Sequence, residues 1–269
     1  LNYDVAIQAP KKYFQPPCET LLKFDKNHEY HSVMNDETFT VLGVHPYDMI
    51  AINQMDELFK QDHYDAHYFA RRKAATVIAC DVITPSENVF AASMETALVK
   101  EGFDILLTDI GNAYILEIAT DKGKKAADIA PVLEDVTEGD LKSREDVWEQ
   151  NKRRLNKHQL KYKPSYLPRL LERAYEHPVW EEKARTCFSC GSCTQVCPTC
   201  YCFDVQDDFS WNLDSGDRER KWDSCQLKGF TEVAGGHEFR NKRSQRFRHR
   251  FYRKAQYVPK KIGGQMACV

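Results

Sequence analysis

Long apolar segments are missing from this sequence. No uncharged apolar run approaches the roughly 18 residues that a membrane-spanning helix needs, and the first residues contain no basic-then-apolar signal peptide. The formal net charge of the 269-residue chain is only −2, so no overall excess of charge favours nucleic acid or an anionic membrane. The simplest location for such a chain is the cytoplasm, and its length allows about two domains.

Nucleotide-binding and catalytic motifs are also missing. The 12 glycines are scattered and form neither a P-loop nor a Gly-x-Gly-x-x-Gly fingerprint. His45, His63 and His67 lack a partner nucleophile or a second ligand at metal spacing, so we expect them in the core or on the surface. The sequence therefore predicts no catalytic residue.

Cysteine, in contrast, is abundant and unevenly placed. Of ten cysteines, Cys18 and Cys80 stand alone, and the other eight lie at position 187 or later. A secreted disulfide scaffold spreads its cysteines through a small, loop-rich domain. In a reducing cytosol, thiols crowded into the last third of a large chain indicate metal ligation.

The strongest motif is Cys-x2-Cys-x2-Cys-x3-Cys-Pro between positions 187 and 198, which is the bacterial ferredoxin run. Three thiolates at this spacing can each reach a different iron of one [4Fe–4S] cube. Gly191 is expected to let the backbone pass close to the cluster, where a Cβ would clash. The last cysteine lies too far along to join the same cube and binds the other cluster in two-cluster ferredoxins. The predicted ligands are therefore Cys187, Cys190 and Cys193 for one cluster and Cys197 for a second.

A zinc knuckle is the alternative interpretation of these cysteines. Zinc sites usually pair two Cys-x2-Cys units separated by a longer spacer. Three evenly spaced cysteines, followed by a fourth with a proline, fit that pattern poorly. We therefore favour iron–sulfur clusters over zinc.

Two clusters require a reciprocal motif, because the first still lacks one thiolate and the second lacks three. Cys268 is the natural first residue of that motif. The chain stops at Val269 and begins at Leu1 without an initiator methionine, so we expect both ends to be truncated. The natural protein should continue as roughly Gly-Cys-Gly-x-Cys, followed by another Cys-Pro.

A long insert separates the two motifs, far longer than a small ferredoxin uses. Its residues 222–233 and 239–257 have helical character, which predicts an α-helical type of dicluster domain. Cys200, Cys202 and Cys225 fall within the insert. They are either buried structural thiols or ligands of a further centre.

The rest of the pattern predicts an α+β protein in three parts. A small α/β docking domain covers residues 1–130, a helical linker covers 131–180, and the α-helical ferredoxin domain covers 181–269. Prolines punctuate the linker helices. The expected elements are strands at 39–44 and 75–79, helices at 47–60, 63–73, 140–158 and 167–176, and a hairpin of 103–108 and 113–118.

Several stretches resemble one known family. They are Gly-Val-His-Pro-Tyr-Asp (43–48), Arg-Arg (71–72), Ile-Ala-Cys (78–80), Ser-Met (93–94), His-Pro-Val-Trp (177–180), residues 187–203, Arg-Glu-Arg-Lys-Trp-Asp-Ser-Cys (218–225), Ala-Gly-Gly-His (234–237) and Phe-Arg (239–240). Over residues 42–269 the chain resembles the iron–sulfur subunit shared by anaerobic sulfite reductase (its A subunit) and the β subunits of soluble nickel–iron hydrogenases and sulfhydrogenases. The resemblance is densest in the C-terminal half.

The resemblance implies a non-catalytic subunit of a cytoplasmic complex of anaerobic metabolism. In that family a flavoprotein subunit exchanges hydride with NAD(P)H or a similar carrier, and a separate catalytic subunit carries siroheme or nickel–iron. This chain is then expected to relay single electrons between them. The terminal reaction is hydrogen oxidation or the reduction of sulfite, sulfur or a disulfide.

The sequence departs from the family pattern in its N-terminal half. The family commonly has cysteine where this chain has Tyr47, Val89 and Ala91. Because Cys80 alone cannot hold a cube, we predict no cluster in the N-terminal domain. Cys80 is then expected to be a small buried residue at the end of a strand.

Residues 239–261 contain ten lysines or arginines and no acid. With aromatic residues interleaved, the stretch is also typical of nucleic-acid binding. The alternative function is therefore a nucleic-acid-associated protein with a structural cluster. Two other interpretations are favoured over it: cations that stabilise reduced clusters and dock an acidic partner, or a solvated helix face. His237, just before this stretch, is a candidate hydrogen-bond donor to a cluster sulfur.

Overall fold

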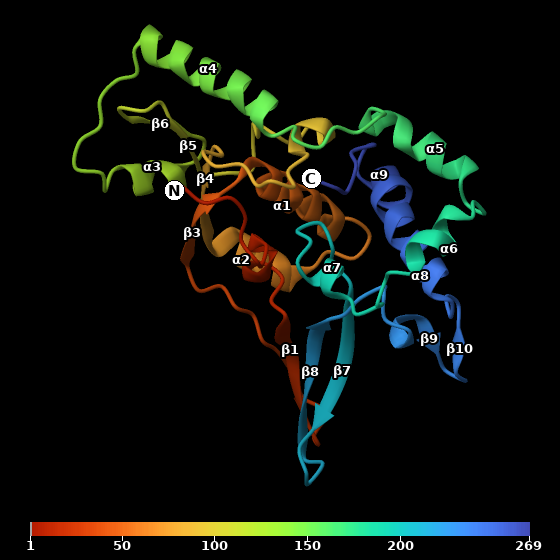
Figure 1. Ribbon diagram of the computed structural model, residues 1–269. Helices are drawn as coiled ribbons and strands as arrows, with labels where there is room; N and C mark the ends of the chain where they lie inside the picture. The colour runs from red at the N-terminus through yellow and green to blue at the C-terminus, as the bar shows by residue number, and fades with distance from the viewer. Residues whose placement is uncertain (1) are drawn as a thin grey trace.

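The computed structural model describes residues 2–269 and combines helices with sheets, as an α+β chain should (Figure 1). The first sheet has the order β3-β4-β5-β6, in which β3, β4 and β5 are parallel and β6 pairs antiparallel with β5. The middle strand β4 is almost wholly apolar, as expected for a parallel strand covered on both faces. The bounds are β3 (Phe39–Val44), β4 (Ala75–Cys80), β5 (Ile105–Asp109) and β6 (Tyr114–Ile118), which confirms the predicted strands and hairpin.

Helices α1 and α2 contribute buried side chains to the core of this sheet. Pro46 occupies the first turn of α1, where a missing N–H breaks no helical hydrogen bond. The buried face of α1 carries Met49, Ile52 and Met55, which pack with Phe14 from the N-terminal segment. The helices of this half are α1 (Pro46–Lys60), α2 (Ala66–Ala74), α3 (Asp121–Ala127) and α4 (Glu138–Arg154), so the helices expected at 47–60, 63–73 and 140–158 are confirmed with small shifts of their ends.

A second sheet joins the two ends of the chain. Its order is β2-β1-β8-β7, and β1 pairs antiparallel with β8 from Cys18 opposite Lys221 to Asp25 opposite Ser215. Figure 1 shows this sheet projecting away from the helices. The strands are β1 (Cys18–Asp25), β2 (Tyr30–Ser32), β7 (Phe203–Phe209) and β8 (Ser215–Trp222). The three-part division of the chain stays a prediction, but its first and last parts share main-chain hydrogen bonds.

The dicluster region is less helical than the sequence pattern suggested. The helix expected at 222–233 is wrong, because Trp222 ends β8 and the following residues form turns that lead into β9. The helix expected from position 239 begins at 243 and continues through a π-helical turn at residues 253–257. The remaining elements are α5 (Leu167–Arg173), α6 (Val179–Ala184), α7 (Ser192–Gln195), β9 (Glu232–Val233), β10 (His237–Glu238), α8 (Arg243–Tyr252) and α9 (Val258–Lys261).

Two further observations place the site. Within the described residues, no helix combines the length and the apolar character that crossing a bilayer requires. The C-terminal segment returns to α1, where the side-chain amide of Gln54 donates to the carbonyl of Met266 at 2.8 Å. Residues next to Cys268 are therefore held beside the N-terminal half of the chain.

Candidate iron–sulfur site

The loop that carries the ferredoxin-type cysteines runs from the end of α6 through α7. Gly191 has φ +80°, a left-handed conformation that L side chains rarely adopt, and a Cβ there would lie 2.9 Å from Cβ of Ser224. The hydroxyl of Thr194 donates to the Gly191 carbonyl at 2.7 Å and lies at hydrogen-bond distance, 2.7 Å, from Oγ of Ser224. The glycine thus serves the turn and its packing on the segment after β8, and the close approach of this backbone to a cluster stays a prediction.

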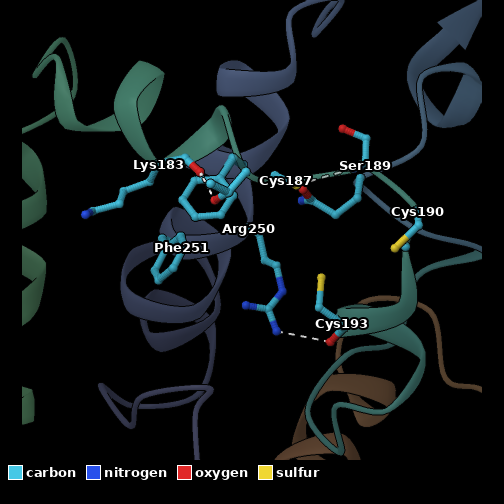
Figure 2. Close-up of a pocket in the computed structure, with 11 residues that line it drawn as sticks. Lys183, Cys187, Ser189, Cys190, Cys193, Arg250 and Phe251 are labelled. Atoms are coloured by element: carbon cyan, nitrogen blue, oxygen red, sulfur yellow. Dashed lines mark hydrogen bonds between the residues drawn. The ribbon is translucent and has the colours of Figure 1, made fainter.

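Three of the predicted ligands surround one cavity of about 360 Å³. Cys187, Cys190 and Cys193 line it together with Phe251 and Arg250, and Figure 2 shows the Arg250 guanidinium reaching toward Cys193. An Nη of Arg250 donates to the Cys193 carbonyl at 3.1 Å. Cys190 and Cys193 are exposed and Cys187 is half-buried. The three thiols are therefore gathered at an open, surface-facing cavity, which we call the outer site.

The outer thiols differ in their surroundings. The hydroxyl of Ser192 lies 3.3 Å from Sγ of Cys190, and this hydrogen bond lowers the pKa of that thiol. Burial raises the pKa of Cys193, although the charge of Arg250 opposes it. Within the described residues, no three cysteine, histidine or acidic side chains converge as a single metal ion requires. A zinc ion needs its sulfurs about 2.3 Å away on all sides, whereas a cube spreads its ligands over four irons.

The structure brings the other two predicted ligands together from distant parts of the sequence. The hydroxyl of Thr199 lies 3.3 Å from Sγ of Cys197 and also donates to the carbonyl of Ala267 at 2.7 Å. Cys268 is thereby held next to Cys197. The ammonium of Lys254 donates to Sγ of Cys197 at 3.2 Å and to the Thr199 hydroxyl. We call this group the inner site; Lys254 and Thr199 are buried in it, and Cys197 and Cys268 are half-buried.

The inner site favours a thiolate at one position. A hydrogen bond from the Cys200 thiol, together with the charge of Lys254, holds the pKa of Cys197 well below its usual range. Burial raises the pKa of Cys268. Burial also raises the pKa of Asp48 to about 7, and the charge of Cys197 adds to the effect. Because Asp48 lies on α1, the inner site is in electrostatic contact with the N-terminal half.

The three additional thiols lie behind the inner site. Cys200 and Cys225 are buried, and Cys202 is half-buried. The Cys225 thiol hydrogen-bonds to Cys202 and lowers its pKa to about 6. These three cysteines line a cavity of only about 20 Å³, which has room for about one water molecule and not for a cube. This geometry favours the interpretation of Cys200, Cys202 and Cys225 as structural thiols.

Three basic side chains near these sites lack an acidic counter-charge. Lys11 is 3% exposed and Lys254 is 8% exposed, and the buried Nε–H of Arg250 has no hydrogen-bond partner among the described residues. Within the same residues, no carboxylate forms an ion pair with any of the three, whereas buried Arg71 and Arg220 both face Glu19.

A buried cation requires a partner anion, because its desolvation is otherwise too costly. The groups around Lys254 are Cys197, Cys200 and Cys268. Burial alone would lower the pKa of Lys254, but negative charge on these sulfurs, Cys197 first, raises it. The buried cations and the cysteines that they face therefore fit an anionic group ligated by thiolates, and an iron–sulfur cluster is such a group.

The central part of the basic stretch at 239–261 is engaged inside the molecule, whereas Lys242, Arg243, Lys260 and Lys261 are exposed. Arg246 is buried and donates to the carbonyls of Gln226, Arg240 and Asn241 at 2.8–2.9 Å, and the guanidinium of Arg248 lies 3.7 Å from the ring centroid of Tyr175. With Arg250 and Lys254 turned toward cysteines, these observations favour the cluster interpretation over nucleic acid. His237 is exposed on β10, and its ring packs edge-on with Phe239.

The family's additional cysteine positions lie in an apolar cluster. Tyr47, Val89 and Ala91 pack with Val82 and Leu155. Cys80 is buried at the end of β4, and burial raises its pKa to about 11, so its thiol is neutral near pH 7. The absence of an N-terminal cluster stays a prediction, and Cys18 is exposed at the start of β1.

Sequence reasoning missed Lys11 as part of the site. Its ammonium donates to the carbonyls of Thr194 at 3.1 Å and of Cys200 at 2.9 Å, on either side of Cys197, and it lies 4.3 Å from the ring centroid of Trp222. Nothing in the local sequence separates Lys11 from its neighbour Lys12. Only the fold brings the N-terminal segment against the cysteine loop.

Comparisons with known proteins agree with this geometry. Residues 186–269 match the family model described as a 4Fe-4S dicluster domain. The chain is 34% identical over 264 residues to sulfhydrogenase 2 subunit beta of Pyrococcus furiosus, and the alignment covers 96% of this chain and 76% of that protein. No solved structure matches significantly.

Proposed function

Because this chain belongs to the family of the sulfhydrogenase beta subunit and contains a 4Fe–4S dicluster domain, we propose that it relays single electrons between two other subunits of an oxidoreductase complex. The family membership confirms the resemblance noted in the sequence. The observation that carries the proposal is the set of buried cations without carboxylate partners, which face cysteines from both ends of the dicluster domain.

The cysteines divide into two ligand sets in this proposal. Cys187, Cys190 and Cys193 hold a cluster at the outer site, and Cys197 and Cys268 belong to a cluster at the inner site. Each cluster supplies storage for one electron. The protein's own groups bind the clusters and surround them with positive charge, since Arg250 faces the outer site and Lys254 the inner one.

The proposed partners are a flavoprotein subunit that uses NAD(P)H or a similar carrier and a catalytic redox subunit, within a cytoplasmic complex. The open outer cavity supports one docking face, because Phe188 beside it is 91% exposed. The catalytic partner would perform hydrogen oxidation or the reduction of sulfite, sulfur or a disulfide. Mass spectrometry of the subunits that co-purify with this chain, together with nickel and siroheme content, distinguishes these reactions.

Anaerobic reductive titration of the full-length protein, followed by EPR, tests the relay. We expect two low-potential [4Fe–4S] signals that interact magnetically. Arg250 lies within electrostatic range of cysteines of both sites, so the two clusters would be close enough for their unpaired spins to couple. A single centre that cannot be reduced, combined with tight and steeply salt-dependent binding of an oligonucleotide, would instead support the nucleic-acid alternative.

A further inference from the structure

The two ligand groups differ in charge and in contact with water. At the outer site, Cys190 and Cys193 are exposed and the cavity is open to solvent. At the inner site, Lys254 lies 3.2 Å from Sγ of Cys197 and is 8% exposed. The two sites are therefore subject to different electrostatic control.

We propose that the buried charge of Lys254 gives the inner site the higher reduction potential, so that an electron accepted at the outer site comes to rest at the inner one. This inference rests on the proposed electron relay and deepens it, because it assigns the direction of transfer and the residue that sets it.

Each one-electron reduction adds a negative charge to a cluster, so a nearby cation stabilises the reduced state. Burial acts in the opposite direction, because a low-dielectric surrounding penalises added charge. Which effect is larger depends on the positive charges near the cluster that no carboxylate neutralises. Lys254 contacts a ligand sulfur directly, and Lys11 donates to carbonyls on both sides of Cys197. In a buried region these interactions are screened far less than at a wet surface.

Arg250 does not produce the difference. It donates to the Cys193 carbonyl at the outer site and also lies within electrostatic range of Cys197 and Cys268. Its charge therefore acts on both sites. Lys254 is placed at the inner site alone, which makes it the positioning residue to change.

The first test substitutes Lys254→Met in the full-length protein, with redox titration monitored by EPR. The higher of the two midpoint potentials should fall while the lower one stays in place. Lys260→Met, an exposed lysine on α9, is the matched control and should move neither. Lys254→Arg keeps the charge and should retain most of the higher potential. A fall of the lower potential, or no change in either, overturns the proposal.

A second test needs no substitution. Raising the ionic strength of the wild-type protein should raise the lower potential, because salt screens the exposed outer site, and should leave the higher potential nearly unchanged. The opposite response would overturn the proposal even if Lys254→Met failed to assemble its cluster. Failure of the relay itself has a different signature, since the wild-type protein would then show no pair of reducible clusters to compare.

Discussion

Lys254 is an example of a site residue that no sequence pattern distinguishes from the other lysines of the chain. The cysteine spacing predicts the ligands, because Cys-x2-Cys-x2-Cys is a local feature. The burial of Lys254 and Lys11 cannot be predicted from local sequence, because it depends on chain segments that come together only in the folded protein. The same limitation applies to Asp104 just before β5: no local pattern marks it as buried, yet it is buried and its carboxylate accepts the Val77 N–H at 2.7 Å.

Gly191 permits a direct test of the cysteine loop. Gly191→Ala should destabilise the protein by about 1–2 kcal/mol from the left-handed backbone alone, with an added cost from contact with Ser224. Urea unfolding and iron content per chain measure the effect. Gly229→Ala is the matched control, because a Cβ there has open space around it. Equal stability of the two variants would contradict the role assigned to the turn.

His45 should make stability depend on pH. It is fully buried, and burial lowers its pKa from 6.5 to about 4. Between these values the unfolded chain binds a proton that the folded chain does not, so the free energy of unfolding should fall as pH drops from about 6.5 to 4, by up to about 3 kcal/mol.

Urea unfolding of His45→Phe measures this dependence. The slope of stability against pH in that interval should be smaller than in the wild type. His63→Phe, at an exposed position, should leave the slope unchanged. If His45→Phe keeps the wild-type slope, the histidine is not buried in its neutral form.

At the scale of elements, local sequence patterns predicted most helices and strands of the first half correctly, but they did not predict which distant strands pair. The strands of the first sheet and the helices of the same half follow from apolar runs and helical periodicity, because the apolar residues within each segment show which of its faces is buried. The β7–β8 hairpin was missed because β8 reads Ser-Gly-Asp-Arg-Glu-Arg-Lys-Trp, which is charged and rich in helix formers. Its partner β1 is nearly 200 residues away in the sequence, so tertiary pairing overrides the local preference.

Buried ion pairs join β1 and β8 to α2 and its N-cap residue Asp65. Arg220 on β8 donates to Glu19 on β1 at 2.8 Å and also pairs with Asp65, and the Arg220 and Glu19 side chains are at most 4% exposed. Arg220→Met should therefore lower the free energy of unfolding by about 3 kcal/mol, since it leaves carboxylates without their partner.

A matched substitution on the same strand separates burial from charge. Arg218 pairs with Asp207 at 2.7 Å in a partly exposed position, so Arg218→Met should cost no more than about 1 kcal/mol. Chemical denaturation of both variants gives the comparison. Similar losses for the two would show that the Arg220 network contributes nothing beyond a surface pair.

At the scale of the whole molecule, the second sheet and the Lys11 contacts tie the N-terminal half to the cysteine loop. We therefore expect one cooperative urea transition, in which far-UV circular dichroism and cluster absorption are lost together. Cluster absorption that disappears well before the secondary structure would instead mean that the dicluster domain unfolds independently, as a strict three-part division of the chain implies.

The proposed function depends most on clusters being held by these cysteines. Its most direct test is chemical analysis of full-length protein prepared without oxygen, for iron, acid-labile sulfide and zinc. We predict about four irons and four sulfides for each of two clusters, hence about eight of each per chain. Stoichiometric zinc, or protein that contains neither iron nor labile sulfide, would contradict the account.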